Sequence, residues 1–297
     1  MLPATFAARQ EFRMPPTGLP QLAEVQNQEN DQMQSAETAE QESGFKVLTQ
    51  AQVASFWENG FLVVGKVLED DLIQEMRAEY DEEFALGRSG DRPVRNLAVF
   101  EDDHDHDEEE GQEMLQFMQI SEHNVQFHKL IYHQGILDII EDVIGPNIQL
   151  FHNQGLYKPP HHGGPIFWHQ DNAYWRCLPP NLVSCWLTLD DVDLHNGAMQ
   201  FIPGSHLRPM IHDQAQGSDV LLDMGKLVDD NEAVVGDLPA GGITLHHCQT
   251  LHRTAPNTTD RQRRALAIHF MTPGTKSART GETIPVNFSH PMLRMRF

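Results

Sequence analysis

The sequence predicts a mainly β protein, an antiparallel jelly roll with helices packed outside it. From residue 147 onward, short apolar segments follow one another with Gly and Pro between them and with no helical pattern in between. Many short strands at close spacing are typical of an antiparallel sandwich or barrel. The chain has 297 residues, 39% of them hydrophobic, which is enough to bury a substantial core.

Helices are expected before these strands. Thr49 and Gln52 have the spacing of a capping box, and Asn59-Gly60 supplies a stop signal, so residues 50–59 predict a short helix. The apolar run 61–64 predicts a strand. Apolar residues at helical spacing predict a second helix over 69–86, ended by Gly87.

Two further helical patterns span 122–133 and 134–144, the second ended by Gly145-Pro146. The predicted strands lie within the segments 148–157, 164–171, 182–192, 198–206, 241–248 and 264–271.

The ends of the chain differ in composition. Residues 1–46 are rich in Gln, Glu, Ala and Pro and hold few large apolar residues, so we expect a low-complexity, disordered tail. The folded domain is expected over 47–297.

Charge and cysteine content narrow the class of protein. With 43 Asp and Glu against 21 Lys and Arg, the formal net charge is -22, which argues against nucleic acid and anionic membranes as partners. Three cysteines without Cys-x-x-Cys spacing indicate neither a disulfide framework nor a thiolate zinc site. No apolar run is long enough to span a bilayer and no targeting segment is recognised, so we expect a cytoplasmic protein that acts on a small molecule. The sequence does not indicate an oligomeric state.

The segment 101–110, EDDHDHDEEE, carries eight carboxylates and two histidines. Blocks of like charge usually form solvated loops, which is the interpretation favoured here, and a cation-binding lid is the alternative.

His169-Gln-Asp171 is the first candidate for chemistry. In an extended strand, side chains at i and i+2 point to the same face, so His169 and Asp171 can aim at one point. A metal site needs a third ligand, and His252 is the candidate because Thr254 and Arg263 follow it at an offset that can return a hydroxyl and a cation to one cavity. Two histidines and a carboxylate are the ligands of non-haem iron(II) oxygenases.

Three segments, 156–175, 182–206 and 251–270, together resemble the phytanoyl-CoA dioxygenase family of Fe(II)/2-oxoglutarate oxygenases. The resemblance covers about residues 47–275. It implies a double-stranded β-helix that uses Fe(II), 2-oxoglutarate and O2 to hydroxylate an unactivated C–H bond. His169, Asp171 and His252 would be both the metal ligands and the catalytic centre.

The same resemblance implies a 2-oxoglutarate site. Arg263 would pair with the distal carboxylate, Thr254 would supply a hydroxyl to it, Trp186 would line the pocket and Gln154 would face the cosubstrate. The chain departs from the family at one point: it has no Lys or Arg from 96 to 128, so a neutral group such as Gln116 or Gln119 is expected where some relatives use a lysine.

Other readings stay open. The fold also suits a non-catalytic metal or small-molecule binding protein, a zinc-dependent isomerase or hydrolase, or an acyl-CoA hydroxylase of the same family. Retention of Asp171 favours oxygen transfer over halogenation; desaturation and cyclisation use the same ligands. The net charge and the acidic run predict a neutral or cationic substrate in preference to an acyl-CoA.

Several polar and aromatic residues have ordinary structural interpretations. Lys158 is read either as an anion-binding group or as a solvated lysine at a strand end. The aromatic residues near the motif are expected in the core or cavity wall, and the remaining paired histidines beside the metal ligands or on the surface. The aromatic residues are Trp168, Tyr174 and Trp175, and the histidine pairs are His161-His162 and His246-His247.

Overall fold

The computed structural model describes residues 45–98, 112–210, 212–214 and 222–296. The chain divides into units 1–44 and 45–297, and the helices and strands described all belong to the second unit. The expected tail, apart from its last two residues, and the acidic segment 101–110 lie outside the described residues, so both interpretations stay predictions.

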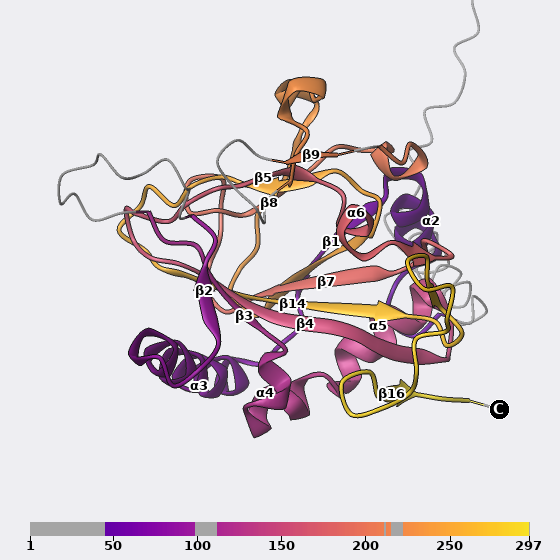
Figure 1. Cartoon of the computed structure of the whole chain (residues 1–297), viewed down its shortest axis with the longest axis horizontal. Helices are drawn as coiled ribbons and strands as arrows, with labels where there is room; N and C mark the ends of the chain where they lie inside the picture. Colours follow the sequence, from indigo (N-terminus) through magenta and orange to yellow (C-terminus); the bar gives the residue numbers. More distant parts are fainter. Residues whose placement is uncertain (1–44, 99–111, 211, 215–221, 297) are drawn as a thin grey trace, which may run out of the picture. The chain divides into compact units, whose positions relative to one another are not determined.

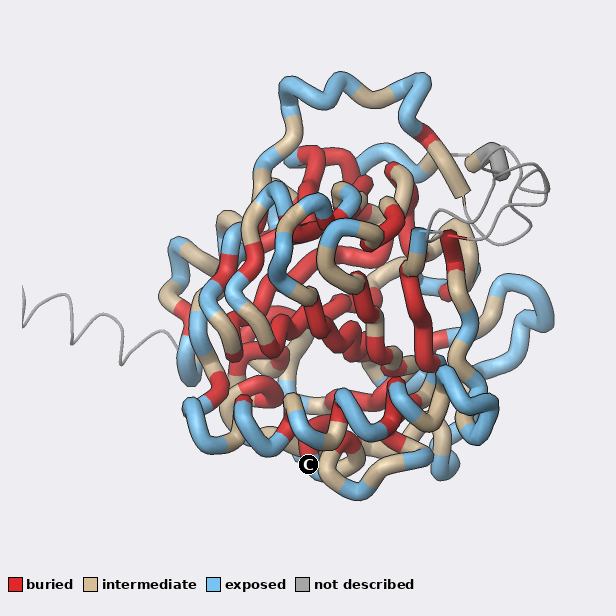
Figure 2. Tube along the Cα trace, turned by 90° about the vertical axis from the view of Figure 1, so that its left-hand side faces the viewer, coloured by how far each residue is buried: buried red, intermediate tan, exposed pale blue. Residues whose placement is uncertain are grey.

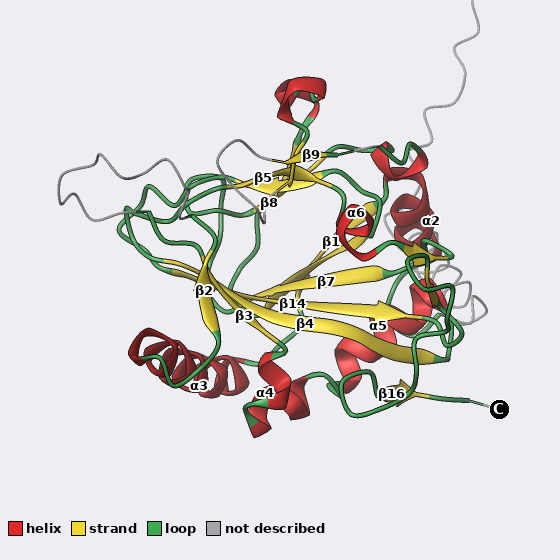
Figure 3. Cartoon of the chain, viewed as in Figure 1, coloured by secondary structure: helices red, strands yellow, loops and turns green. Residues whose placement is uncertain are grey.

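The described residues form short helices and many strands (Figure 3). The helices are α2 (Gln50–Asn59), α3 (Asp70–Ser89), α4 (Val125–Leu130), α5 (Gln134–Ile144) and α6 (Asp171–Trp175). The strands are β1 (Phe61–Lys66), β2 (Val94–Asn96), β3 (Leu115–Met118), β4 (Ile148–Lys158), β5 (Ile166–His169), β6 (Cys177–Leu178), β7 (Val183–Thr188), β8 (Met199–Phe201), β9 (Asp213–Gln214), β10 (Leu222–Asp223), β11 (Val234–Gly236), β12 (Gly242–His247), β13 (His252–Thr254), β14 (Arg263–Met271), β15 (Lys276–Ser277) and β16 (Met292–Arg294).

Two antiparallel sheets form the jelly roll. The larger runs β1-β12-β7-β14-β4-β3-β2, with β16 also paired to β4, and the smaller runs β11-β8-β13-β5. In Figure 1 the helices α3, α4 and α5 lie on one side of the larger sheet and the smaller sheet lies on the other. The predicted fold class is therefore confirmed.

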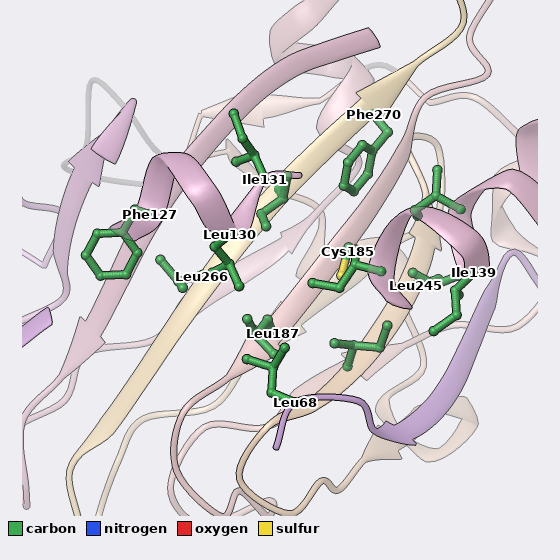
Figure 4. Packing of buried hydrophobic residues seen from close by; sticks show 14 of the residues in the cluster. Leu68, Phe127, Leu130, Ile131, Ile139, Cys185, Leu187, Leu245, Leu266 and Phe270 are labelled. Carbon is green, nitrogen blue, oxygen red and sulfur yellow. The ribbon is translucent and has the colours of Figure 1, made fainter. Parts of the chain in front are cut away.

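The two faces of the larger sheet have different roles because side chains alternate along a strand. Cys185, Leu187 and Leu266 point to the helices and pack in the main core with Ile131 and Ile139 (Figure 4). The opposite face looks toward the smaller sheet. Buried segments fill the interior of this unit in Figure 2.

A second cluster joins the two sheets. It contains Trp186 and Ala267 from the larger sheet and Met199 from the smaller one. Phe61 of β1 stacks on Phe201 of β8 with ring centroids 4.6 Å apart. Apolar packing thus holds the two sheets together, and Trp186, Met199 and Ala267 of this cluster also line a cavity.

The first predicted helix is confirmed in detail. The Thr49 side chain accepts a hydrogen bond from the backbone of Gln52, and the Gln52 side chain accepts one from the backbone N–H of Thr49, which completes the capping box. Gly60 ends the helix in the left-handed region, with φ of 83°.

The predicted end of α3 was wrong. The helix continues through Gly87 and ends at Gly90, whose φ is 87°. Glycine at position 87 is instead required by packing, because a Cβ there would lie 2.3 Å from Val94 Cγ2. Sequence alone does not separate a glycine that ends a helix from one that admits a neighbour.

Two other bounds differ from prediction. The helix expected over 122–133 is only α4, because Asn124 caps it by accepting from the backbone of Gln126 and Phe127. The strand expected over 164–171 ends at His169, and Asp171 opens α6.

None of the described helices is long and apolar enough to cross a bilayer. The three cysteines are buried and carry free thiols.

Candidate active site

Three candidate metal ligands meet at the edge of the smaller sheet. His169 is the last residue of β5, Asp171 is the first of α6 and His252 is the first of β13. Strands β5 and β13 are antiparallel neighbours with His252 opposite His169. The register of this pair therefore unites two histidines that are distant in the sequence.

The three side chains are buried and close enough to share one ion. Their ligand atoms all lie within 4.8 Å of one another. Oδ1 of Asp171 is 3.6 Å from Nε2 of His169 and 3.5 Å from Nε2 of His252. Two imidazoles and a carboxylate leave other positions open on an iron ion, so the donor set fits Fe(II).

Backbone carbonyls orient both imidazoles. His169 Nδ1 lies 2.8 Å from the carbonyl of Phe167, and His252 Nδ1 lies 2.9 Å from that of Thr250. A carbonyl only accepts, so Nδ1 carries the proton and each Nε2 keeps its lone pair for a metal. Burial lowers the pKa of His169, which keeps it neutral and able to bind a cation.

The second carboxylate oxygen of Asp171 is held separately. Ser184 Oγ donates to Oδ2 over 3.0 Å, and His246 Nε2 lies 3.1 Å from the same atom. Burial by itself would raise the pKa of Asp171, but His252, His169 and His246 outweigh burial and hold the pKa well below its usual value. The ligand is therefore ionised and fixed in orientation.

The intervening Gln170 faces away, as predicted, although the strand stops one residue earlier. Its side chain donates to the carbonyl of Gln249 over 2.6 Å and accepts from the backbone of Met210 over 3.0 Å. It ties two loops together behind the metal ligands.

A cavity of about 640 Å³ opens in front of the three ligands, a size common for small-molecule sites. Arg263 and Thr254 line it. Arg263 is fully buried. Its guanidinium donates to the Leu156 carbonyl over 2.8 Å and to the Met114 sulfur over 3.7 Å and lies over the Trp186 ring, 5.7 Å from the centroid, but it pairs with no carboxylate of the described residues.

Both residues keep buried polar atoms without a partner in the described structure, Nε of Arg263 and Oγ1 of Thr254. Burial lowers the pKa of Arg263 to about 10, so the group stays charged near neutral pH. A buried, unpaired guanidinium is costly unless an anion joins it. These donors fit a carboxylate group of 2-oxoglutarate.

Arg263 reaches this place by a different route from the one expected. The offset from His252 suggested two neighbouring antiparallel strands, but β13 belongs to the smaller sheet and β14 to the larger. The two residues line one cavity because the sheets face each other across it.

Trp186 and Gln154 also line the cavity, as the resemblance implied, and so does Gln116. Gln119 does not line it. The Gln119 side-chain oxygen instead contacts Nδ1 of His152 at 3.0 Å and accepts from the backbone of Asn153 over 3.1 Å.

The interpretation of Lys158 as a solvated lysine was wrong. Its side chain is fully buried, and its Nζ donates to the carbonyls of Gly164 and Ala255 over 2.6 Å each. It is not solvated and is not among the residues that line the cavity. Its neighbour across β4 and β14 is Arg263, so it helps to shape the wall behind that residue.

The aromatic residues lie where core or wall residues were expected. Trp168 is buried and donates to Asp230 over 2.8 Å, while Tyr174 and Trp175 line the cavity. Of the paired histidines, only His246 contacts a candidate ligand.

The sequence did not indicate a polar row across the larger sheet. His246, Ser184, His269 and His152 are successive cross-strand neighbours on β12, β7, β14 and β4. Their alternation with apolar residues was the available signal, but it identifies no partner until the register is known.

The charged lining also differs from the prediction. Four arginines line the cavity, whereas Asp171 is the one carboxylate among the lining residues. The arginines are Arg95, Arg253, Arg263 and Arg279. This lining does not support a neutral or cationic substrate. The net charge describes the whole chain, whereas the fold gathers arginines from four separate segments.

A model of the family described as phytanoyl-CoA dioxygenase (PhyH) matches residues 56–265. A probable alpha-ketoglutarate-dependent hypophosphite dioxygenase of Stutzerimonas stutzeri is 31% identical over 147 residues, which are 48% of this chain and 51% of that protein. The peroxisomal phytanoyl-CoA dioxygenase of Mus musculus is 29% identical over 240 residues, 75% of this chain and 68% of the mouse protein.

Among solved structures, the epimerase SnoN in complex with Fe3+, alpha ketoglutarate and nogalamycin RO is similar with a TM-score of 0.64 and 23% identity. The match covers 82% of this chain and 98% of SnoN. At this level of sequence identity, the similarity shows the fold alone.

Fold, ligand set and relatives together define the class as the non-haem iron oxygenases that depend on 2-oxoglutarate and O2. The chain belongs to the phytanoyl-CoA dioxygenase family, whose model spans most of the jelly roll.

Proposed function

We propose that the protein hydroxylates a C–H bond of a small molecule while 2-oxoglutarate is converted to succinate and CO2. Iron bound by His169, Asp171 and His252 would supply the activation of O2. The observation that carries this proposal is the convergence of these buried ligand atoms within 4.8 Å, in the same cavity as an unpaired Arg263.

The side chains have separable tasks in this proposal. The histidines bind through Nε2 because their Nδ1 protons are held by backbone carbonyls. Ser184 and His246 hold one oxygen of Asp171 so that the other faces the ion. Arg263 and Thr254 hold the distal carboxylate of 2-oxoglutarate, and Trp186 and Gln154 form the wall beside it.

The rival interpretation of a non-catalytic binding protein does not explain two donor sets in one cavity. An ion-binding protein needs the three ligands, but not a buried guanidinium without a carboxylate. An enzyme that turns over 2-oxoglutarate at a metal ion must bind both the ion and this organic acid in one cavity.

The test has a binding stage and a turnover stage. Without O2, adding Fe(II) and 2-oxoglutarate to the full chain should produce a metal-to-ligand charge-transfer band, which Zn(II) does not give. On admission of O2, slow uncoupled turnover should release succinate. A band without succinate would indicate a binding protein, and absence of both would contradict the proposed function.

The matched control for this test is Thr258→Val. Thr258 is on the connection between β13 and β14, the strands that carry His252, Thr254 and Arg263, but its hydroxyl donates to the His195 carbonyl and it does not line the cavity. This variant should keep both the band and the succinate, whereas Asp171→Ala should lose both.

A further inference from the structure

The arginines that line the cavity differ in whether a partner already neutralises their positive charge. Arg253 pairs with Asp230 over 2.9 Å, and Arg263 is assigned to 2-oxoglutarate. Arg95 and Arg279 line the same cavity, and neither pairs with a carboxylate of the described residues. Two positive charges near the metal site are therefore left for another ligand.

The arginines without a carboxylate partner among the described residues are concentrated at the cavity. Most of the described arginines form an ion pair, for example Arg264 with Asp81 and Asp190. The described arginines that have no carboxylate partner among the described residues are Arg95, Arg176, Arg208, Arg263 and Arg279. Three of these line the cavity, so the unpaired cations gather at the site.

Both free arginines are exposed, yet each is held in place by one hydrogen bond. Arg95 Nε donates to Gln116 Oε1 over 2.5 Å, and Gln116 in turn donates to Gln154. Arg279 Nη2 donates to the Tyr174 carbonyl over 2.6 Å. Each bond uses one N–H group of the guanidinium, and other N–H donors of each group have no partner among the described residues.

Both groups interact with Tyr174. Arg279 binds its carbonyl, and the charge of Arg95 reaches its ring: burial raises the pKa of Tyr174 to about 12, and Arg95 opposes that rise. The cavity lining also contains apolar residues, among them Leu97, Met118, Ile166 and Trp175.

From this arrangement we infer that the prime substrate is an organic oxyanion, whose carboxylate or phosphate binds Arg95 and Arg279 while its apolar body enters the cavity toward the metal ligands. Guanidinium groups suit both kinds of oxyanion because they offer two parallel N–H donors. The inference rests on the proposed function for the reaction, but the anion site stands on its own geometry.

The experiment titrates three small probes into the full chain by calorimetry: phenylacetate, phenyl phosphate and the neutral phenylacetamide. Fe(II) and 2-oxoglutarate are present at saturation and O2 is excluded, so that Arg263 is occupied. At least one anion should bind about tenfold or more tightly than the amide. Comparing the two anions shows whether a carboxylate or a phosphate is preferred.

The variant Arg95→Gln/Arg279→Gln should lose this preference for anions and keep its affinity for 2-oxoglutarate. The control Arg176→Gln/Arg208→Gln removes two other exposed, unpaired arginines that do not line the cavity, so the net charge changes equally. The control should keep the preference. Equal binding of amide and anions by the wild type, or equal loss in both double variants, would overturn the inference.

Failure of the proposed function would give a different experimental result from failure of the anion-site inference. If the wild type binds neither Fe(II) nor 2-oxoglutarate, the oxygenase proposal fails, and the same titration of the metal-free protein still decides the anion site. Preference for anions that depends on Arg95 and Arg279 supports the site in either case.

Discussion

Ser184 Oγ lies 3.0 Å from Oδ2 of Asp171 and 2.7 Å from Nδ1 of His269. Burial keeps the pKa of His269 well below its usual value, so the ring is neutral. The serine proton belongs to the carboxylate, and the hydroxyl oxygen therefore accepts from Nδ1–H of His269. The other ring nitrogen then accepts from Gln154 Nε2, 3.5 Å away.

Removing this hydroxyl should weaken metal binding. We expect Ser184→Ala to lower Fe(II) affinity about tenfold to a hundredfold, because groups that orient a ligand usually contribute that much. Competition with a coloured chelator measures the affinity. Ser184→Thr retains a hydroxyl and should recover most of it; unchanged affinity in the alanine variant would leave His246 as the sufficient support.

Loss of the carboxylate itself should be more severe. Asp171→Ala removes a ligand and its negative charge, so we expect no charge-transfer band with Fe(II) and 2-oxoglutarate and no succinate release. Calorimetry of 2-oxoglutarate binding to the metal-free variant should still detect Arg263. Succinate at the wild-type rate, without added carboxylate, would rule out the assigned ligand set.

The next prediction distinguishes the binding of 2-oxoglutarate, to which Thr254 contributes, from the binding of iron. Thr254→Val keeps the shape of the side chain and removes one buried, unpartnered hydroxyl. A hydrogen bond to a charged group contributes about 1.5–3 kcal/mol, so 2-oxoglutarate affinity should fall about tenfold to a hundredfold. Fe(II) affinity should stay constant in the same preparation.

Arg263→Leu should lower the 2-oxoglutarate affinity by at least as much as Thr254→Val. Because Arg263 is fully buried, its loss is also expected to impair folding. Thr254→Val tests the same cosubstrate site without removing a buried charge, so a loss of affinity in that variant does not depend on Arg263. If iron binding fell while 2-oxoglutarate binding did not, both residues would have to be assigned to the structure of the metal site.

The sequence was informative where chemistry depends on local spacing. His169 and Asp171 are two residues apart, and a short extended stretch is sufficient to aim them together. His252, Thr254 and Arg263 were found because a family motif places them, although the strand pairing expected for Arg263 was wrong.

The sequence was silent where the site depends on strand register. Ser184, His246 and His269 meet only because β7, β12 and β14 are neighbours with one particular register. Arg95 and Arg279 are far apart in the sequence, so the net charge of the chain did not indicate that they line one cavity. Lys158 shows the same limit, since burial at a strand end has no signature in the residues around it.

Acid sensitivity is the last prediction, and it concerns His247, which is buried and does not line the cavity. Burial, together with His206 and His246, lowers its pKa from 6.5 to about 4. Its Nδ1 accepts from the backbone of Gln249 over 3.2 Å, so the folded state favours the neutral ring.

The unfolded chain therefore binds a proton at His247 before the folded chain does. Between pH 6.5 and about 4 the unfolded state holds more protons, so the free energy of unfolding falls as the pH falls through this range. A shift of this size corresponds to about 3 kcal/mol. In His247→Gln, urea unfolding of the metal-free protein should show a shallower loss of stability over the same range, by up to that amount. Wild type and variant are compared as the change in unfolding free energy with pH, which removes any constant effect of the substitution. Parallel curves would mean that His247 does not contribute to acid sensitivity.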